Sequence, residues 1–146
     1  METIKMNTLK RNIFLTFATA LVIFSLSSCA VKAKFLTSSV VPAAQGQIKV
    51  TNDKNNNYVI KIKISDLADP SRLLPPKNLY VVWIETNDAF PQNMGQVKTS
   101  THFLSKQLQG SFETVSALKP SKVFITAEDD GGIQYPSLVV LSTDNF

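Results

Sequence analysis

Cysteine and histidine are nearly absent from this chain of 146 residues, which contains one of each, Cys29 and His102. A single cysteine cannot form an internal disulfide bond. Blue copper sites need two histidines and a cysteine thiolate, and structural zinc sites need a full set of cysteine and histidine ligands, so the sequence supports neither. No serine stands in a Gly-x-Ser-x-Gly elbow, so a Ser-His-Asp triad also lacks support. We therefore predict no catalytic residue, no metal site and no cofactor, and we interpret His102 as a surface or half-buried side chain of a strand.

The chain also lacks a hydrophobic segment long enough to span a membrane. Its main apolar run, residues 13–26, has 14 residues. A helix of that length would cover about 21 Å of a hydrocarbon core of roughly 30 Å. Basic residues precede the run and small residues follow it, namely Lys5, Lys10, Arg11, Ser27 and Ser28. This order is typical of a signal peptide, which we assign to residues 1–28.

The four residues Leu26-Ser27-Ser28-Cys29 resemble the lipobox of bacterial lipoproteins, which consists of an aliphatic residue, two small residues and a cysteine. The resemblance implies that the signal is cleaved before Cys29, that a diacylglyceryl group is attached to its sulfur, and that the new amino terminus is open to acylation, for example by palmitate. Two or three acyl chains hold a protein stably on a bilayer. We therefore expect a lipid-anchored protein of the cell envelope, on the outer membrane and facing the periplasm. The alternative is a secreted protein with an incidental free cysteine.

Residues 29–146 carry twelve basic and ten acidic side chains, so removal of the signal lowers the net charge from +4 to +2. The lysines are scattered along the sequence without a basic cluster, and we therefore predict no nucleic-acid binding. Residues 29–45 mix small, apolar and hydroxyl side chains, which favours a tether with a first edge strand at 39–41 that Pro42 interrupts. A flexible tether of this length would hold the domain about 20–25 Å from the lipid.

From residue 46 onward, short segments with a period of two predict an all-β domain over residues 46–146. The segment YVIKIKI at 58–64 alternates apolar side chains with lysines, and the most hydrophobic segment, 78–86, predicts a central strand. Turn residues at 52–57, 87–93 and 129–132 separate such segments. We predict strands at 47–51, 58–64, 78–86, 95–99, 102–108, 111–115, 122–128 and 138–142. Seven or eight short strands predict an Ig-like antiparallel β-sandwich.

Part of this domain also resembles a known family. The segment YVVW at 80–83, Gly95 and the segment FITAEDDGGIQYPSLVVLST at 124–143 are similar to the carboxy-terminal, extracytoplasmic domain of anti-sigma-K factor regulators. The resemblance covers residues 46–144 and implies a β-sandwich outside the cytoplasm. Membrane-bound anti-sigma factors also have a cytoplasmic sigma-binding domain and a transmembrane helix, which this sequence does not show. We therefore do not expect it to regulate a sigma factor.

Two sets of acidic residues are candidates for chemistry. The run Glu128-Asp129-Asp130 lacks the spacing that wraps a loop around Ca²⁺, and we interpret it as a hairpin tip. Glu85 and Glu128 are the carboxylates that an enzymatic alternative would pair, although sequence alone does not place them in space.

Five apolar residues are candidates for binding. Tyr80 and Trp83 could stack on a sugar, but they stand three apart on a strand and therefore point to opposite faces. We predict that Trp83 packs in the core. Phe90, Leu73 and Leu74 fall in predicted loops and are our candidates for an exposed contact patch.

The sequence thus favours a non-enzymatic envelope lipoprotein whose sandwich binds another protein or serves in envelope assembly. The motivation is a complete anchor next to a domain without a recognisable set of catalytic residues. The alternative is a module that binds carbohydrate or another small ligand, for which the sequence identifies no ligand-binding residues.

Overall fold

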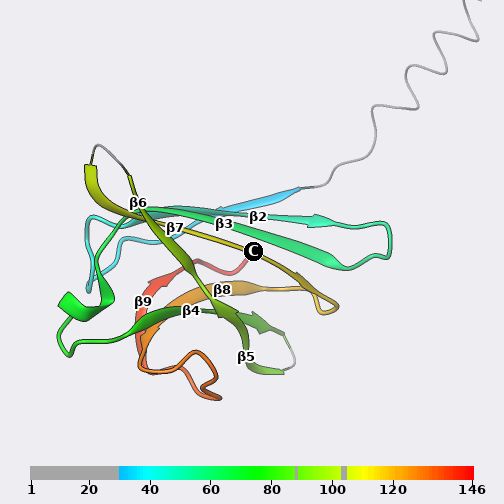
Figure 1. Cartoon of the computed structure of the whole chain (residues 1–146). Helices are drawn as coiled ribbons and strands as arrows, with labels where there is room; N and C mark the ends of the chain where they lie inside the picture. Colours follow the sequence, from blue (N-terminus) through cyan, green and yellow to red (C-terminus); the bar gives the residue numbers. More distant parts are fainter. Residues whose placement is uncertain (1–29, 88, 103–104) are drawn as a thin grey trace, which may run out of the picture.

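The computed structural model describes residues 30–87, 89–102 and 105–146, which form two antiparallel sheets packed face to face (Figure 1). The five-stranded sheet has the order β1 (Val31–Lys34), β2 (Gln45–Asn52), β3 (Tyr58–Leu67), β7 (Ser105–Ser116) and β6 (Lys98–His102). The four-stranded sheet has the order β5 (Ala89–Gln96), β4 (Leu79–Thr86), β8 (Lys122–Glu128) and β9 (Leu138–Ser142). The predicted antiparallel β-sandwich is confirmed, with nine strands in the described residues.

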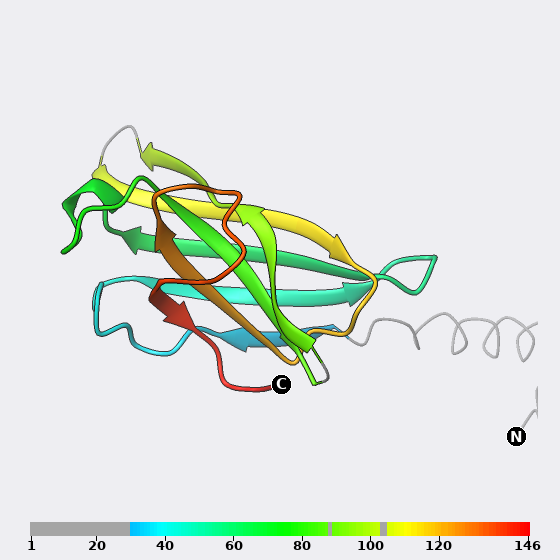
Figure 2. The same ribbon diagram turned by 90° about the horizontal axis from the view of Figure 1, so that it is seen from below.

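The core lies between the two sheets because each strand alternates its side chains between two faces. In β3 the isoleucines point inward and the lysines outward, as the alternation predicted. The five-stranded sheet contributes Ile48, Val50, Ile60, Ile62 and Ile64, and the four-stranded sheet contributes Tyr80, Val82, Ile84, Val123, Ile125, Val140 and Leu141. Seen from below, the strands of the two sheets cross one another at an angle, as in a sandwich of twisted sheets (Figure 2).

Three predicted boundaries differ from the structure. Residues 87–93, expected as a turn, supply much of β5, which pairs with β4. Of the expected strand at 102–108, His102 ends β6, residues 103 and 104 lie outside the described residues, and residues 105–108 join 111–115 in the single strand β7. Residues 95–99 are divided between β5 and β6. Asparagine, proline and glutamine favour turns locally, but pairing with β4 overrides that preference, and β5 is an edge strand, where proline is tolerated.

The first edge strand also lies elsewhere than predicted. The sequence favours residues 39–41, whereas the structure has β1 at Val31–Lys34, paired with β2 from Val31↔Val50 to Lys34↔Gln47. Val41 and Ala44 are buried in the core. Residues 31–45 therefore belong to the sandwich rather than to a tether.

Phe35 fixes the chain after β1 at one end of the sandwich. Its ring packs over Gly46, where an added Cβ atom would lie 2.7 Å from Phe35 Cδ2 and 2.9 Å from the Lys63 carbonyl oxygen. Phe35 also forms an isolated antiparallel bridge with Thr143. The segment thus joins the edge of one sheet to the last strand of the other.

The predicted turn at 52–57 is confirmed, and the connections before and after β3 are each capped by an aspartate side chain. The hairpin between β2 and β3 turns at Asn56, which has φ 61°, and the Asp53 carboxylate accepts hydrogen bonds from Asn57 and Asn55. These hydrogen bonds lower the pKa of Asp53, and those from Asn57 have the largest effect. Between β3 and β4, the only helical element is the short 3₁₀ turn η1 (Pro70–Arg72), capped by Asp69.

Candidate functional site

Two of the predicted residues lie outside what the structure describes. Cys29 immediately precedes the first described residue, and the side chain of His102 is also not among those described. Within residues 30–87, 89–102 and 105–146, no group of three or more histidine, cysteine, aspartate or glutamate side chains could hold a metal ion. In that part of the chain, no helix has the length and apolar character required to cross a membrane. Lipid attachment at Cys29 stays a prediction.

The three acidic residues at the end of β8 diverge toward separate partners. Glu128 is buried, and its carboxylate accepts hydrogen bonds from the Ser137 backbone N–H, at 2.8 Å, and from the Ser137 hydroxyl. Asp129 forms an ion pair with Lys77, with 2.8 Å between Oδ2 and Nζ. Asp130 accepts a hydrogen bond of 2.8 Å from a backbone N–H of its own turn. The run closes a loop, in agreement with its interpretation as a hairpin tip.

Glu85 and Glu128 do not form a carboxylate pair. In the ladder between β4 and β8, Glu85 pairs with Lys122, whereas Glu128 lies at the other end of β8, opposite Leu79. Six residue steps along a strand correspond to about 20 Å. The Glu85 carboxylate instead lies 3.6 Å from Lys122 Nζ.

Trp83 is sealed on the outer face of the four-stranded sheet. Its side chain is 0% exposed, stacks on Phe124 with 6.1 Å between ring centroids, and donates a 2.8 Å hydrogen bond from Nε1 to Thr126 Oγ1. Ile133 packs against this cluster, and the loop that carries it folds over the sheet (Figure 2). Asn93 on β5 holds the loop by donating to the carbonyls of residues 131 and 133. Trp83 is therefore a packing residue, as predicted, and cannot stack on a sugar in the folded protein.

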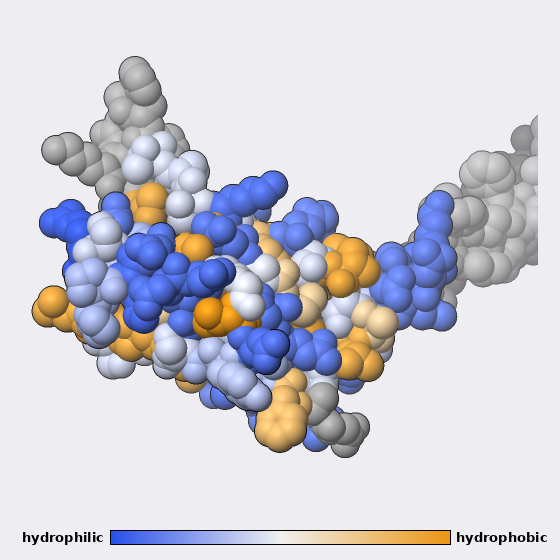
Figure 3. Space-filling view, turned by 60° about the horizontal axis from the view of Figure 1, so that its bottom comes forward, coloured by the Kyte–Doolittle hydropathy of each residue, from blue (hydrophilic) through white to orange (hydrophobic). Residues whose placement is uncertain are grey.

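The predicted contact patch is wrong as a single surface. Leu73 is buried in the core, because the 3₁₀ turn before it directs its side chain inward. Leu74 and Phe90 are each 90% exposed, but they flank opposite ends of β4, whose eight residues span about 25 Å. Figure 3 shows the same dispersion, with apolar residues set between hydrophilic ones on the face that it displays.

The outer face of the five-stranded sheet gathers lysines that are far apart in the sequence. Strand register aligns one row through Lys32, Lys49, Lys61 and Glu113, and a second through Lys34, Gln47, Lys63, Ser111 and Lys98. We call the six lysines of these rows the lysine face, and all six are exposed. Glu113 pairs with Lys61, with 2.9 Å between the charged atoms. Lysines that are scattered along the sequence are thus gathered on one face of the folded chain.

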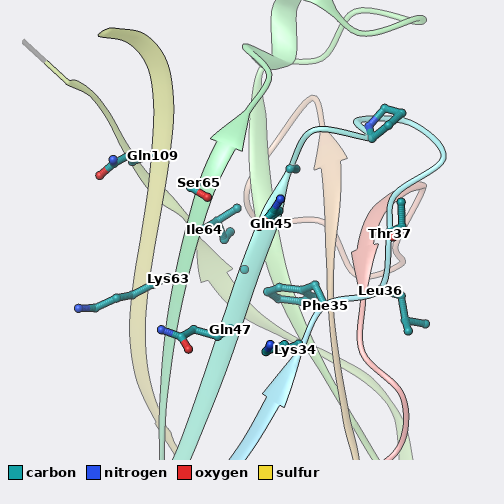
Figure 4. Close-up of a pocket in the computed structure, with 13 residues that line it drawn as sticks. Lys34, Phe35, Leu36, Thr37, Gln45, Gln47, Lys63, Ile64, Ser65 and Gln109 are labelled. Carbon is teal, nitrogen blue, oxygen red and sulfur yellow. The ribbon is translucent and has the colours of Figure 1, made fainter. Parts of the chain in front are cut away.

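A groove of about 600 Å³ lies at one end of the lysine face (Figure 4). Lys34, Gln47 and Lys63 lie side by side across β1, β2 and β3, and Gln45 and Ser65 form the next row. Their ammonium and amide groups are hydrogen-bond donors that suit anionic and hydroxyl oxygen atoms.

The sequence contained only part of the signal for this surface. The lysines of residues 58–64 alternate with isoleucines, which places them on the outer face of one strand, but the alignment of Lys32, Lys49 and Lys98 beside them depends on register.

Among known proteins, we found no family model, curated protein or solved structure that matches the chain.

Proposed function

We propose that this protein is a lipid-anchored, non-enzymatic lipoprotein of the cell envelope, placed on the outer membrane and facing the periplasm, whose sandwich is a module for protein interaction or envelope assembly. The lipobox at residues 26–29 supports the anchor. The resemblance of residues 46–144 to the extracytoplasmic domain of anti-sigma-K factor regulators supports a place outside the cytoplasm.

The exposure of Phe90 on an edge strand is the observation that supports the interaction role. It stands on β5, an edge strand of the four-stranded sheet, and is 90% exposed. Edge strands present backbone N–H and C=O groups to which another chain can add, and buried aromatic rings are frequent anchors of protein interfaces. Pro91 follows and lacks an N–H, which limits unselective pairing along this edge. An exposed ring on a restricted edge is suited to a specific partner.

The anchor is tested by Cys29→Ser in the full chain. We expect the variant to keep its signal or to be released as a soluble product, whereas the wild type is cleaved and sediments with membranes. Metabolic labelling with an acyl-chain analogue should mark the wild type alone. A variant that is processed and fractionated like the wild type would contradict lipid attachment.

The interaction role is tested by placing a photo-crosslinking amino acid at position 90 in cells that express the full chain. We expect a discrete crosslinked protein, lost when Cys29→Ser is added. Position 74 is the matched control, because Leu74 is equally exposed, at 90%, but lies at the other end of β4. The proposal fails if position 90 yields no product, or yields the same products as position 74.

A binding module for carbohydrate or another small ligand is the second candidate, and the groove favours it. Calorimetric titration of the full chain in detergent with acidic and neutral saccharides tests this function. We expect an acidic sugar to bind the wild type and to lose affinity in the double variant Lys34→Gln and Lys63→Gln. The paired control, Lys54→Gln with Lys119→Gln, removes the same charge away from the groove and should bind normally. Equal binding by both double variants would exclude the groove as the site.

A further inference from the structure

We infer that the lysine face docks on the surface of an anionic phospholipid bilayer and holds the sandwich against the membrane that carries its anchor. The inference rests on the proposed anchor at Cys29. It goes beyond that anchor because it assigns a partner and an orientation to a surface of the folded domain.

Positive and negative charges are unevenly distributed over the molecule. The six lysines of the face, together with Glu113, sum to +5, whereas residues 29–146 as a whole sum to +2. The rest of those residues therefore sums to −3. A surface of this sign is attracted to an anionic bilayer, and the remainder of the protein is repelled from it.

Protection of sheet edges explains only half of these lysines. Lysine on an edge strand prevents unwanted strand pairing, which accounts for the lysines of β1 and β6. Lys49, Lys61 and Lys63 lie on the interior strands β2 and β3, and Lys49 is directly opposite both Lys32 and Lys61. Like charges directly opposite one another destabilise a sheet. An anionic surface against this face would neutralise that repulsion.

The position of the anchor selects a bilayer as the source of that negative charge. Cys29 stands two residues before Val31, the first residue of β1, and two residue steps cover at most about 7.6 Å between Cα atoms. The Debye length at physiological ionic strength is about 8 Å. A lipidated Cys29 therefore keeps the edge of the lysine face within electrostatic range of the headgroups, which a tether of 20–25 Å would not do.

The groove at the end of this face fits the headgroup chemistry. Lys34 and Lys63 offer ammonium groups, and Gln47 between them offers an amide, to the oxygen atoms of a phosphate. Each lysine at an anionic membrane surface raises affinity about fivefold. Phosphatidylglycerol, with a net negative charge, should therefore engage the face, and zwitterionic phosphatidylcholine should not.

The experiment compares the lipidated protein, produced in cells from the full chain, in phosphatidylcholine vesicles with the same protein in vesicles that also contain phosphatidylglycerol. A water-soluble acetylating reagent modifies exposed lysines, and mass spectrometry gives the rate at each site. We expect Lys49, Lys61 and Lys63 to react several-fold more slowly on the anionic vesicles, and salt at about 1 M, where the Debye length is about 3 Å, to remove the difference. Lys54 lies in the turn between β2 and β3 and Lys119 in the loop between β7 and β8, both outside the face, and they should react equally on both.

Flotation in high salt separates failure of the docking from failure of the anchor. A chain that does not float with either vesicle would refute the proposed anchor. A chain that floats with both, but whose face lysines react equally on both, would overturn the docking alone. Protection of the face in intact cells but not on anionic vesicles would assign the face to a protein partner and would also overturn it.

A matched pair of variants tests the residues. Lys32→Gln, Lys49→Gln and Lys61→Gln together should abolish the protection of Lys63. Lys54→Gln, Arg72→Gln and Lys119→Gln remove the same charge elsewhere and should leave it unchanged. Equal protection of Lys63 in both triple variants would contradict the assignment of the face.

Discussion

The two sheets share one core but differ on their outer faces. Over the four-stranded sheet, a loop covers a second cluster that contains Trp83 and Phe124. Over the five-stranded sheet, the corresponding surface is open and carries the lysine face. The covered face adds buried apolar area and fixed hydrogen bonds, whereas the open face retains repulsion between aligned charges.

The contrast indicates that stability comes mainly from the covered face and that the open face is available for interaction. Changes under the loop should lower the free energy of unfolding, and changes on the lysine face should leave it unchanged or raise it slightly. Three substitutions test that division and a fourth tests the shared core, and they follow in order of decreasing expected effect.

The largest effect is expected for Trp83→Ala. The substitution removes a fully buried ring, its stacking on Phe124 and its hydrogen bond to Thr126, and large-to-small aromatic substitutions in cores cost about 3–5 kcal/mol. Urea denaturation followed by circular dichroism measures the loss. Phe90→Ala removes an equally aromatic but exposed ring and should change the free energy of unfolding by less than about 0.5 kcal/mol. Similar effects of the two substitutions would contradict a sealed face on the four-stranded sheet.

Glu128→Ala should weaken the closure of the loop. Hydrogen bonds to a charged group contribute about 1.5–3 kcal/mol each, and the substitution removes those that Ser137 donates from its N–H and O–H groups. Since Trp83 is the only tryptophan, acrylamide quenching of its fluorescence reports on the cover directly. We expect greater quenching in this variant, and unchanged quenching in Asp130→Ala. A variant with a wild-type fluorescence and denaturation midpoint would show that the loop closes without Glu128.

Tyr80→Phe tests the core that both sheets share. The phenol donates a 2.9 Å hydrogen bond to the Ala68 carbonyl, and its loss should cost about 1 kcal/mol at pH 7. Burial, the larger cause, and repulsion from the Asp69 charge, the smaller one, raise the pKa of Tyr80 to about 12, compared with about 10 in an unfolded chain. The neutral phenol therefore contributes full stability below about pH 10, and that contribution is lost as the pH rises from about 10 to 12.

Denaturation as a function of pH separates the two effects of this substitution. The phenylalanine variant should be less stable at pH 7 and should show a smaller decline in stability between about pH 10 and 12. Tyr135→Phe is the control, because Tyr135 is exposed. Parallel alkaline curves for wild type and Tyr80→Phe would contradict a buried, neutral phenol.

The smallest effect, and the one of opposite sign, is expected for Lys49→Glu. A glutamate between Lys32 and Lys61 replaces repulsion with attraction and should stabilise the protein by about 0.2–1 kcal/mol at low salt. The gain should shrink as salt shortens the Debye length. Lys54→Glu, in the turn after β2, makes the same charge change without lysines opposite it. A loss of stability in Lys49→Glu, or an equal gain in both variants, would show that the aligned lysines do not repel one another.

Local sequence patterns correctly predicted features that depend on residues close in the sequence. They failed for features that depend on pairing between strands that are distant in the sequence. The alternation in residues 58–64 correctly assigned the inward isoleucines and outward lysines of β3. The composition of residues 87–93 indicated a turn, because nothing local shows that β4 supplies their hydrogen bonds. The lysine face joins residues from Lys32 to Lys98, and only strand register brings them together. The burial of Leu73 likewise depends on the path of the chain after η1.

The pairing of β1 with β2 also has a mechanical consequence. Four residue pairs join the strands, and an edge ladder of this kind opens at lower free energy than the core. Pulling on the residues ahead of Val31 loads this ladder first, while Phe35 and the buried Val41 and Ala44 resist further peeling. Complete release of residues 31–44 would give a flexible segment with an end-to-end distance of about 20 Å. The first strand can therefore detach and extend under a pulling force before that force acts on the core of the sandwich.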